Sequence, residues 1–314
     1  MNNTPLISIL IPLYNAEQYI EETITRALEQ TYSNIELIIV DDHSTDQSLS
    51  IAQKYACNNI HIYTNPKKGG NAARNYAFQM SKGEYVKFMD ADDYCSKDMV
   101  EKQLKAILEK GTQKSLAFSP VEMLYPDGSL VVPHREIDKD YFPGIELLID
   151  IWKGKGWNCP HCHLMHRSLV TLAKGWDETI IKNQDGEFFA RIASLADKAL
   201  SVKDTYAYWR QTGIGVSTKR SIESHASMLK SYDIISSLIL HYKDSTDNRK
   251  ICAKYISFFV YQYYPEIKPL LPEIDKLLLK LKQPLILPNR KILIILKFIL
   301  GWKRALTIIK KFNL

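Results

Sequence analysis

The stretch YVKFMDADDY, residues 85–94, joins a short apolar run to three closely spaced carboxylates, Asp90, Asp92 and Asp93. Three earlier stretches are equally short, apolar and rich in β-branched residues: LISILIPLY (6–14), IELIIVDD (35–42) and IHIYTN (60–65). Runs of this kind are typical of strands that are buried on both faces of a sheet. We therefore expect four strands here, the last of them over 84–93.

Helical patterns separate these strands. Apolar residues recur at helical spacing in three segments: AEQYIEETITRALEQ (16–30), DQSLSIAQKYA (46–56) and NAARNYAFQMS (71–81). The last two begin with Asp46 and Asn71, which are favourable N-cap residues. The alternation predicts an α/β fold with a doubly wound, mostly parallel sheet. Ligands of such sheets bind at the carboxyl ends of the strands, where Asp41, Asp42 and the later acidic cluster lie.

The composition is that of an ordinary globular protein. The 314 residues are 46% hydrophobic and 24% charged, which suits one large or two medium domains. The first apolar run has no positively charged residue before it and no small-residue cleavage site after it, so we expect no signal peptide and a cytoplasmic protein. The five cysteines are then expected to be free thiols.

The net charge of +6 is concentrated at one end of the chain. Asp275 is the last acidic residue, and ten Lys or Arg residues follow it. The remainder carries 31 basic and 35 acidic residues, or about −4. This asymmetry argues against a nucleic-acid-binding protein and for a local electrostatic contact of the tail.

The acidic cluster at 90–93 predicts a cation site. Three neighbouring carboxylates raise one another's pKa unless a cation or hydrogen-bond donors offset their charge. Mg²⁺ or Mn²⁺ bound together with a diphosphate is the natural partner, because hard cations bind carboxylate and phosphate oxygens. The alternative is a structural role, in which Asp93 or Ser96 caps the helix predicted over 96–110.

Four motifs in sequence order carry a family resemblance: ISILIPLYN, IIVDDHSTD, GGNAARNYA and FMDADD. They resemble the nucleotide-binding half of the family 2 inverting glycosyltransferases, which have the GT-A fold. GWDETIIKNQDGEFFARI (175–192) is similar to the family segment that holds the catalytic base, and YWRQTGIGVS (208–217) to the strand and loop that follow. The resemblance spans residues 6 to about 217 and implies a nucleotide-sugar donor, with UDP as the nucleotide.

The resemblance also implies roles for individual residues. Asp92 would hold the Mn²⁺ or Mg²⁺ ion that bridges the donor diphosphate. Asp42 would hydrogen-bond the base, Asp90 would face the ribose, and Arg74, whose alternative role is a surface salt bridge, would lie at the same pocket. The nucleotide-binding residues carried over from the family are Pro12, Tyr14, Asp42, Arg74 and Asp90.

Transfer of the sugar needs a base, because the acceptor hydroxyl must lose its proton as it attacks the anomeric carbon. The resemblance implies that Asp185 is this base, as the Asp of the family's usual Glu-Asp pair. The preceding residue here is Gln184 rather than Glu. Glu187 is the second candidate. The structural alternative for both acids is a solvated helix N-terminus, where the helix dipole favours negative charge.

NCPHCHLMH (158–166) contains Cys159-x-x-Cys162-His163, which also spells a haem attachment motif or half of a zinc site. The sequence has no second Cys-x-x-Cys pair. We therefore expect loop or strand residues that contact the acceptor.

The rest of the chain predicts a hairpin and then helices. Pro-Asp-Gly at 126–128 indicates the hairpin turn, and 222–282 has helical character.

Basic residues then recur in the tail about every seventh position, which places them on one stripe of an amphipathic helix. Such a helix is typical of an anionic membrane surface; the alternative is a helix packed on the core with snorkelling lysines. The expected organisation is a glycosyltransferase domain, a helical extension and a basic amphipathic helix, at 1–217, 218–283 and 284–314.

Together these features predict an inverting glycosyltransferase of polysaccharide biosynthesis, peripheral on the inner face of the membrane. It would move a sugar to a hydroxyl of a glycan or of a lipid-linked saccharide. Three alternatives stay open. One is a haloacid-dehalogenase-type phosphatase with Asp90 as nucleophile, although that motif has Thr or Val at the position that Tyr94 occupies here. The others are a receiver-like module and an inactive relative that binds only nucleotide or membrane.

Overall fold

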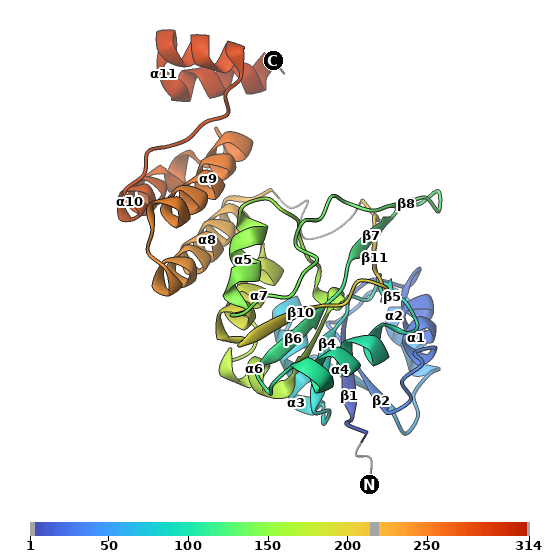
Figure 1. Cartoon of the computed structure of the whole chain (residues 1–314). Helices are drawn as coiled ribbons and strands as arrows, with labels where there is room; N and C mark the ends of the chain where they lie inside the picture. Colours follow the sequence, from blue (N-terminus) through green and yellow to red (C-terminus); the bar gives the residue numbers. More distant parts are fainter. Residues whose placement is uncertain (1–3, 214–219, 313–314) are drawn as a thin grey trace. The chain divides into compact units, whose positions relative to one another are not determined.

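The computed structural model describes residues 4–213 and 220–312. The chain forms two compact units, an α/β unit and a helical unit (Figure 1). The α/β unit comprises Met1–Thr179 and Gln184–Gly215, and the helical unit comprises Ile180–Asn183 and Val216–Leu314. The last part of the YWRQTGIGVS motif, 214–217, lies outside the described residues.

A seven-stranded sheet with the order β10-β6-β9-β4-β1-β2-β3 forms the centre of the α/β unit. Its strands are β1 (Ile7–Leu13), β2 (Ile35–Asp41), β3 (Ile60–Thr64), β4 (Tyr85–Phe88), β6 (Ser115–Phe118), β9 (His163–His166) and β10 (Lys198–Ser201). Neighbouring strands are parallel except at β9, which runs antiparallel to both β4 and β6. The predicted mostly parallel sheet is confirmed.

Helices cover both faces of this sheet, as a doubly wound fold requires (Figure 1). Along β1, Ile9 and Ile11 pack into the core on one face, and Leu10 packs into the core on the other. The helices of the first face are α1 (Ile20–Leu28), α2 (Ser48–Gln53) and α4 (Met99–Lys110). Those of the second face are α3 (Gly70–Met80), α5 (Ile145–Trp152), α6 (Arg167–Leu172) and α7 (Gln184–Leu195).

A smaller sheet has the order β5-β11-β7-β8. Its strands are β5 (Tyr94–Cys95), β7 (Val121–Leu124), β8 (Leu130–Val131) and β11 (Ala207–Arg210). The predicted hairpin joins β7 to β8, with Gly128 at φ 80° and its N–H donating to the carbonyl of Tyr125 over 2.9 Å. Because β5 directly follows the acidic cluster, this sheet holds one end of that cluster in place.

Several local expectations were wrong. The fourth strand ends at Phe88 rather than at 93, because the carboxylates form a turn in which the Asp93 N–H donates to the Asp90 carbonyl over 3.2 Å. Gln47 and Gly69, not Asp46 and Asn71, are the N-caps of α2 and α3. Asp46 still accepts a hydrogen bond from the N–H of Ser48 in the first turn of α2. The N-cap of α4 is Asp98, not Asp93 or Ser96.

The helical unit contains α8 (Ile222–Tyr242), α9 (Thr246–Tyr263), α10 (Leu271–Leu281) and α11 (Lys291–Phe312), together with a short 3₁₀ helix, Lys268–Leu270. The predicted helical extension is confirmed. Ser221 and Ser224 form a capping box at the start of α8. The tail helix begins at Lys291, and Gly301 (φ 75°, ψ 159°) breaks it in two, so the basic residues do not form one continuous helical stripe. Within the described part of the chain, no helix is both long enough and apolar enough to cross a bilayer.

Candidate active site

A buried arginine links α3 to the acidic turn after β4. The Arg74 Nη2 atom lies 2.7 Å from the Asp90 Oδ1 atom, and the guanidinium lies 4.6 Å from the ring centre of Trp176. Burial lowers the pKa of Arg74, but the charges of three carboxylates outweigh it and raise the pKa: Asp90, Asp185 and Asp92. The predicted nucleotide residues and the predicted base therefore act electrostatically on the same cation. The alternative of a surface salt bridge for Arg74 is wrong, since the side chain is buried.

The remaining carboxylates of the turn are hard to ionise. Burial and the charge of Asp90 raise the pKa of Asp92 to about 6. Burial, and then the charges of Asp92 and Asp90, raise the pKa of Asp93 well above its ordinary value. The His161 ring faces Asp93, 3.4 Å from Nδ1 to Oδ2, and burial lowers the pKa of His161 to about 4. A cation placed at Asp92 would relieve this accumulation of charge.

Arg210, on β11, fixes the acidic turn from the side of the smaller sheet. Its backbone N–H donates to Asp93 Oδ1 over 2.8 Å, and its Nε donates to the Asp92 carbonyl over 2.8 Å. The guanidinium also lies 2.8 Å from Glu22 and over the ring of Tyr19. The turn is therefore held by both sheets.

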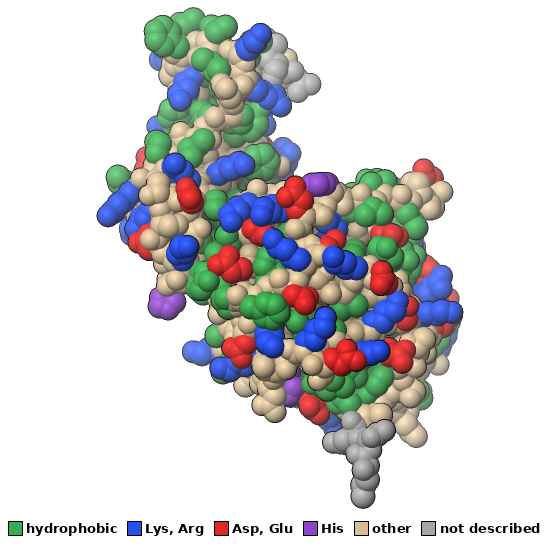
Figure 2. Space-filling view, in the orientation of Figure 1, with side chains coloured by type: hydrophobic (Ala, Val, Ile, Leu, Met, Phe, Trp, Pro, Cys, Tyr) green, Lys and Arg blue, Asp and Glu red, His purple; other side chains and the backbone are tan. Residues whose placement is uncertain are grey.

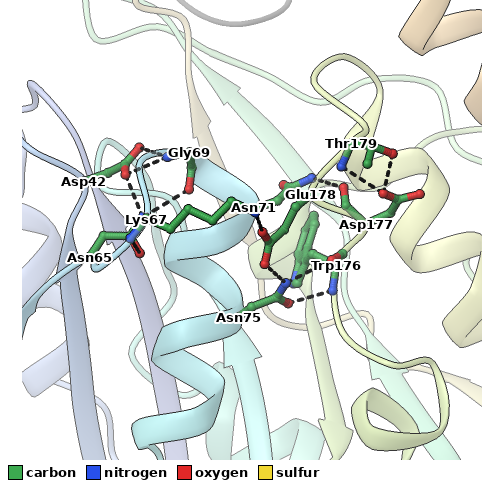
Figure 3. Close-up of polar contacts among 10 residues, drawn as sticks. All are labelled: Asp42, Asn65, Lys67, Gly69, Asn71, Asn75, Trp176, Asp177, Glu178 and Thr179. Carbon is green, nitrogen blue, oxygen red and sulfur yellow. Dashed lines mark hydrogen bonds and ion pairs between the residues drawn. The ribbon is translucent and has the colours of Figure 1, made fainter.

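Asp42 joins the loops that follow β2 and β3 (Figure 3). It accepts hydrogen bonds from Asn65 Nδ2 over 2.7 Å and from the backbone N–H of Gly69 over 2.8 Å. Gly69 has φ 141°, a conformation that favours glycine, and α3 starts at the next residue. Asp42 thus positions the N-terminus of α3, on which Arg74 lies, and has this structural role before any ligand binds.

The loop 176–179 is tied to α3 (Figure 3). Asn75 accepts from the Trp176 N–H over 2.8 Å and donates to the Trp176 carbonyl over 2.9 Å. Asn71 donates to the Asp177 carbonyl over 2.8 Å, and Lys67 pairs with Glu178. Gly175 has φ 69°, which favours glycine, and a Cβ there would lie 2.6 Å from Asn75 Oδ1 and displace this amide. The loop 176–179, which leads to the predicted base, is therefore hydrogen-bonded to α3, the helix that carries Arg74.

The two candidate bases differ in their surroundings. Asp185 lies in the first turn of α7, and its Oδ1 is a buried atom without a hydrogen-bond partner among the described residues. Burial raises its pKa to about 6; the charge of Asp90 adds to this, and the charges of Arg74 and His163 oppose it. Glu187 is buried in a bidentate pair with Arg191, at 2.6 and 2.8 Å. Arg191 also donates to the carbonyl of Gly175 over 2.7 Å, which gives Glu187 a structural role.

The first two predicted nucleotide residues lie at the carboxyl end of β1. Pro12 pairs with Val40 in the sheet. Tyr14 follows the strand, is half exposed, and has the Lys68 ammonium 5.6 Å from its ring centre. About half of the Tyr14 surface is therefore accessible to a ligand.

The Cys-x-x-Cys stretch lies in the protein interior, where it forms a 3₁₀ turn, Pro160–Cys162, and leads into β9. Both thiols are free and buried. The fully buried Lys87 Nζ donates to the carbonyls of His161 and His163 over 2.6 and 3.1 Å, and so fixes the turn. The predicted contact between the stretch 158–166 and an acceptor stays a prediction.

The acidic turn suits a metal ion that is held partly by the protein and partly by a bound ligand, rather than one held by protein side chains alone. Over residues 4–213 and 220–312, no three His, Cys, Asp or Glu side chains form a group that could hold a metal ion. The zinc alternative for the Cys-x-x-Cys stretch therefore lacks a ligand set among these residues. Asp92, with its raised pKa, fits a hard cation whose other ligands are diphosphate oxygens and water.

The sequence interpretation missed Arg210 and Trp176. Both lie inside motifs that it quoted, YWRQ and GWDET, yet neither has a residue type or spacing that indicates a site. Arg210 matters because both its backbone N–H and its side chain donate hydrogen bonds to the acidic turn. Trp176 matters because its ring lies under the Arg74 guanidinium and stacks on Phe188, whose ring centre lies 4.1 Å away.

Comparisons with known proteins identify the family and the fold. The family model described as "Glycosyl transferase family 2" matches residues 8–171. An uncharacterized glycosyltransferase of Haemophilus influenzae is 40% identical over 126 residues, 38% of this chain and 50% of that protein. The Escherichia coli protein WfaP, named a UDP-Glc:alpha-D-GlcNAc-diphosphoundecaprenol beta-1,3-glucosyltransferase, is 43% identical over 100 residues, 32% of this chain and 40% of that protein. The chain thus spans half or less of the length of these relatives.

The fold is similar to that of TarS of S. aureus. The crystal structure of TarS residues 1–349 with UDP-GlcNAc superposes with a TM-score of 0.70, over 98% of this chain and 91% of that one. The sequences are 20% identical in this alignment, so the likeness concerns the fold.

Proposed function

Because this chain belongs to glycosyl transferase family 2, we propose that it is an inverting glycosyltransferase that uses a nucleotide-sugar donor, with UDP as the nucleotide. The acceptor is a hydroxyl of a glycan or of a lipid-linked saccharide. Family membership supports the transfer of a sugar and sets aside the phosphatase and receiver alternatives, and inversion is part of the proposal. The choice of UDP and of a lipid-linked acceptor is supported by the named donor and acceptor of WfaP and by the UDP-GlcNAc complex of TarS.

The observation that carries the proposal is the arrangement around Arg74. Its guanidinium pairs with Asp90 and also lowers the pKa of Asp185. Arg74 Nε and Asp185 Oδ1 are buried polar atoms that lack hydrogen-bond partners within the described structure. An unsatisfied donor and acceptor in one site are costly unless a ligand binds them. A sugar diphosphate and an acceptor hydroxyl have the complementary groups.

In this proposal Asp185 is the general base. Its pKa of about 6 keeps it ionised at neutral pH, yet basic enough to accept a proton from the attacking hydroxyl. The hydroxyl attacks the anomeric carbon as the bond to the diphosphate breaks, and a single displacement inverts the configuration. Asp42, Asp90 and Arg74 hold the nucleotide, together with Pro12 and Tyr14. A Mg²⁺ or Mn²⁺ ion at Asp92 would neutralise charge on the leaving diphosphate.

Calorimetric titration tests the proposal. UDP, GDP, dTDP and CDP are titrated into the protein with and without Mn²⁺, alongside Asp92→Ala and the exposed control Asp127→Asn. We expect one nucleotide to bind in a metal-dependent manner, and this binding to disappear only in Asp92→Ala. Transfer from the corresponding sugar nucleotide, with the product anomer assigned by NMR, then tests inversion. A folded protein that binds none of the four nucleotides would contradict the metal and nucleotide assignments together and leave an inactive relative.

We also propose that the tail binds an anionic membrane surface, at the inner face of the membrane. Apolar side chains lie exposed on α11, with Lys and Arg beside them (Figure 2). Phe298 is 91% exposed, and the exposed isoleucines near it are Ile292, Ile294, Ile295 and Ile299. The ten basic residues after Asp275 are attracted to anionic lipids by about 1 kcal/mol each when close to the surface. Such a location would place the enzyme beside a lipid-linked acceptor.

Cosedimentation with phosphatidylglycerol vesicles tests membrane binding. The variant Ile295→Glu/Phe298→Glu should lose binding, whereas Leu279→Glu, at an exposed apolar position of α10, should keep it. Binding to neutral phosphatidylcholine vesicles should be weaker than to anionic ones. Equal sedimentation of the wild type and the double variant would contradict the proposal.

A further inference from the structure

A cleft of about 260 Å³ lies in the α/β unit, at the smaller sheet. Helix α1 lies beside β5 there (Figure 1), and residues of its C-terminal end form one wall. We call this the tyrosine cleft, and its lining includes Arg26, Glu29, Tyr94, Lys97, Leu130 and Tyr208. Its volume is slightly below the range of roughly 300–1,000 Å³ that drug-sized ligands occupy, so it suits a ligand of about one ring.

Two tyrosines form the aromatic part of the cleft. Tyr94 on β5 and Tyr208 on β11 are cross-strand partners, and their rings stack with centres 4.8 Å apart and an interplanar angle of 27°. Both residues are partly exposed. Leu130, on the edge strand β8, is 49% exposed and adds aliphatic surface. Partly exposed aromatic rings beside an aliphatic side chain favour a ligand with an apolar face.

Charged side chains of both signs surround the tyrosines. The Arg26 guanidinium lies 5.3 Å from the ring centre of Tyr94. It also pairs with Glu29 over 3.3 Å and with Glu22 over 3.5 Å. A guanidinium has five N–H donors, so these two pairs leave others for a ligand, and the exposed Lys97 adds more. Because two carboxylates neutralise Arg26, the cleft suits uncharged hydroxyl groups, which both donate and accept, better than a phosphate.

The tyrosine cleft adjoins the acidic turn. Tyr94 directly follows Asp93, and Tyr208 lies two residues before Arg210, on the same face of β11. The Arg210 guanidinium lies 5.6 Å from the ring centre of Tyr94 and donates to the Asp92 carbonyl. Arg210 thus joins the cleft to the turn that carries the proposed metal ligand.

We propose that the tyrosine cleft is a saccharide subsite, which binds one ring of a glycan other than the ring that reacts. A pyranose has an apolar C–H face and a rim of hydroxyl groups, and the lining matches both. Tyr94 and Tyr208 contact the C–H face, while Arg26, Glu29 and Lys97 hydrogen-bond with the hydroxyls. The class of ligand rests on the proposed function, in which the acceptor is a glycan or a lipid-linked saccharide; the subsite is additional to the residues proposed for transfer.

Saturation-transfer NMR on the full-length protein tests the subsite. The ligands are the methyl glycosides of glucose, galactose, mannose, rhamnose, glucuronic acid, N-acetylglucosamine and N-acetylgalactosamine, without donor. The cleft variants are Tyr208→Ala and Glu29→Ala/Lys97→Ala. The second keeps the tyrosine pair, so it does not disturb the sheet that this pair helps to hold. Matched controls are Tyr242→Ala, at an exposed tyrosine of α8, and Lys105→Ala, at an exposed lysine of α4.

We expect at least one glycoside to bind with a Kd of about 1–10 mM, as is usual for a ligand of about a dozen non-hydrogen atoms. The strongest saturation transfer should reach the protons of one C–H face of the ring. Tyr208→Ala should weaken binding about tenfold or more through lost aromatic contact, and Glu29→Ala/Lys97→Ala about three- to tenfold through lost hydrogen bonds. Both controls should stay within about twofold of the wild type. Saturating UDP with Mn²⁺ should not displace the glycoside.

Three outcomes would overturn the inference. One is that none of the glycosides binds, and another is that either cleft variant retains the wild-type affinity. The third is that UDP with Mn²⁺ displaces the glycoside, which would place it in the active site instead.

The proposed function fails in a different way, through the absence of nucleotide binding and of transfer. A protein that binds no nucleotide, but whose glycoside binding depends on Tyr208 and on the pair Glu29 and Lys97, would overturn the proposed function and leave the cleft as a saccharide site. A protein that transfers sugar, but whose cleft variants bind glycosides like the wild type, would keep the proposed function and overturn the subsite.

Discussion

The Arg74 Nη2 atom lies 2.7 Å from Asp90 Oδ1, and this ion pair is the electrostatic centre of the site. Three carboxylates raise the pKa of the same guanidinium: Asp90 and Asp92 from the turn after β4, and Asp185 from α7. In return Arg74 lowers the pKa of Asp185 and of Asp92. The ionisation of the proposed base is therefore coupled to the presence of this cation.

Replacement of Arg74 should shift the pH dependence of turnover. Asp185 must be deprotonated to act, so in the wild type activity appears as the pH rises through about 6. Arg74→Met removes the cation that opposes the effect of burial, so the acidic limb should move upward, by about one pH unit for each ~1.4 kcal/mol of interaction lost. Arg74→Lys keeps the charge and should leave the limb near 6. A limb that does not move in Arg74→Met would show that Asp185 does not set it.

Asp185→Asn should lower activity and raise stability. Between its ordinary pKa of 3.8 and its folded pKa of about 6, Asp185 binds more protons in the folded state, so the free energy of unfolding falls as the pH rises through this range. The neutral asparagine avoids this loss. At pH 7.5 we expect the thermal midpoint to rise by about 2–4 °C, as for about 1 kcal/mol of stability. Turnover should fall by about 10²–10⁴-fold.

Glu187→Gln is the matched comparison for Asp185→Asn, because both acids lie in the first turn of α7. It breaks the bidentate pair with Arg191 and should lower the thermal midpoint while leaving the acidic limb of the pH profile in place. If Glu187→Gln instead removes the limb and Asp185→Asn retains it, Glu187 is the base.

The sequence predicted those parts of the site in which acidic residues directly follow a strand. Asp42 and the acidic turn follow apolar runs, and the turn indeed lies at the carboxyl end of β4. Its internal arrangement was not predictable. Asp93 is an aspartate like Asp92, yet it is buried against Arg210 and His161. Arg210 reaches it only because the smaller sheet brings together strands that are distant in the sequence, and residue type does not indicate that.

The helices show the same division between local and non-local information. Helical spacing located α1 and α3, because an apolar face is local in sequence. The segment 180–183 could not be assigned to the helical unit, because its binding depends on hydroxyls about 45 residues away on α8. Gly301 likewise gave no signal that it breaks the tail helix, since isolated glycines are tolerated in helices.

Lys87→Met should destabilise the protein without changing nucleotide affinity. Lys87 is fully buried, and its Nζ donates to Gln103 Oε1 over 3.1 Å as well as to two backbone carbonyls. Methionine fills a similar volume but leaves these acceptors unpaired, at a cost of about 1–3 kcal/mol for each buried group left unsatisfied. Urea denaturation should show a lower midpoint with an unchanged slope. Equal stability of Lys87→Met and the wild type would mean that water replaces the ammonium.

Metal-dependent donor binding should weaken below pH 6. Asp92 has a pKa of about 6, so a proton competes with the cation, and at pH 5 the affinity for Mn²⁺ should be about tenfold lower than at pH 7. UDP-glucose and UDP-N-acetylglucosamine are suitable ligands, because their diphosphates do not titrate in this range. Asp92→Asn should bind Mn²⁺ weakly at every pH, whereas Asp127→Asn should follow the wild type. A wild-type affinity for Mn²⁺ that stays constant from pH 5 to 7 would place the metal on groups other than Asp92.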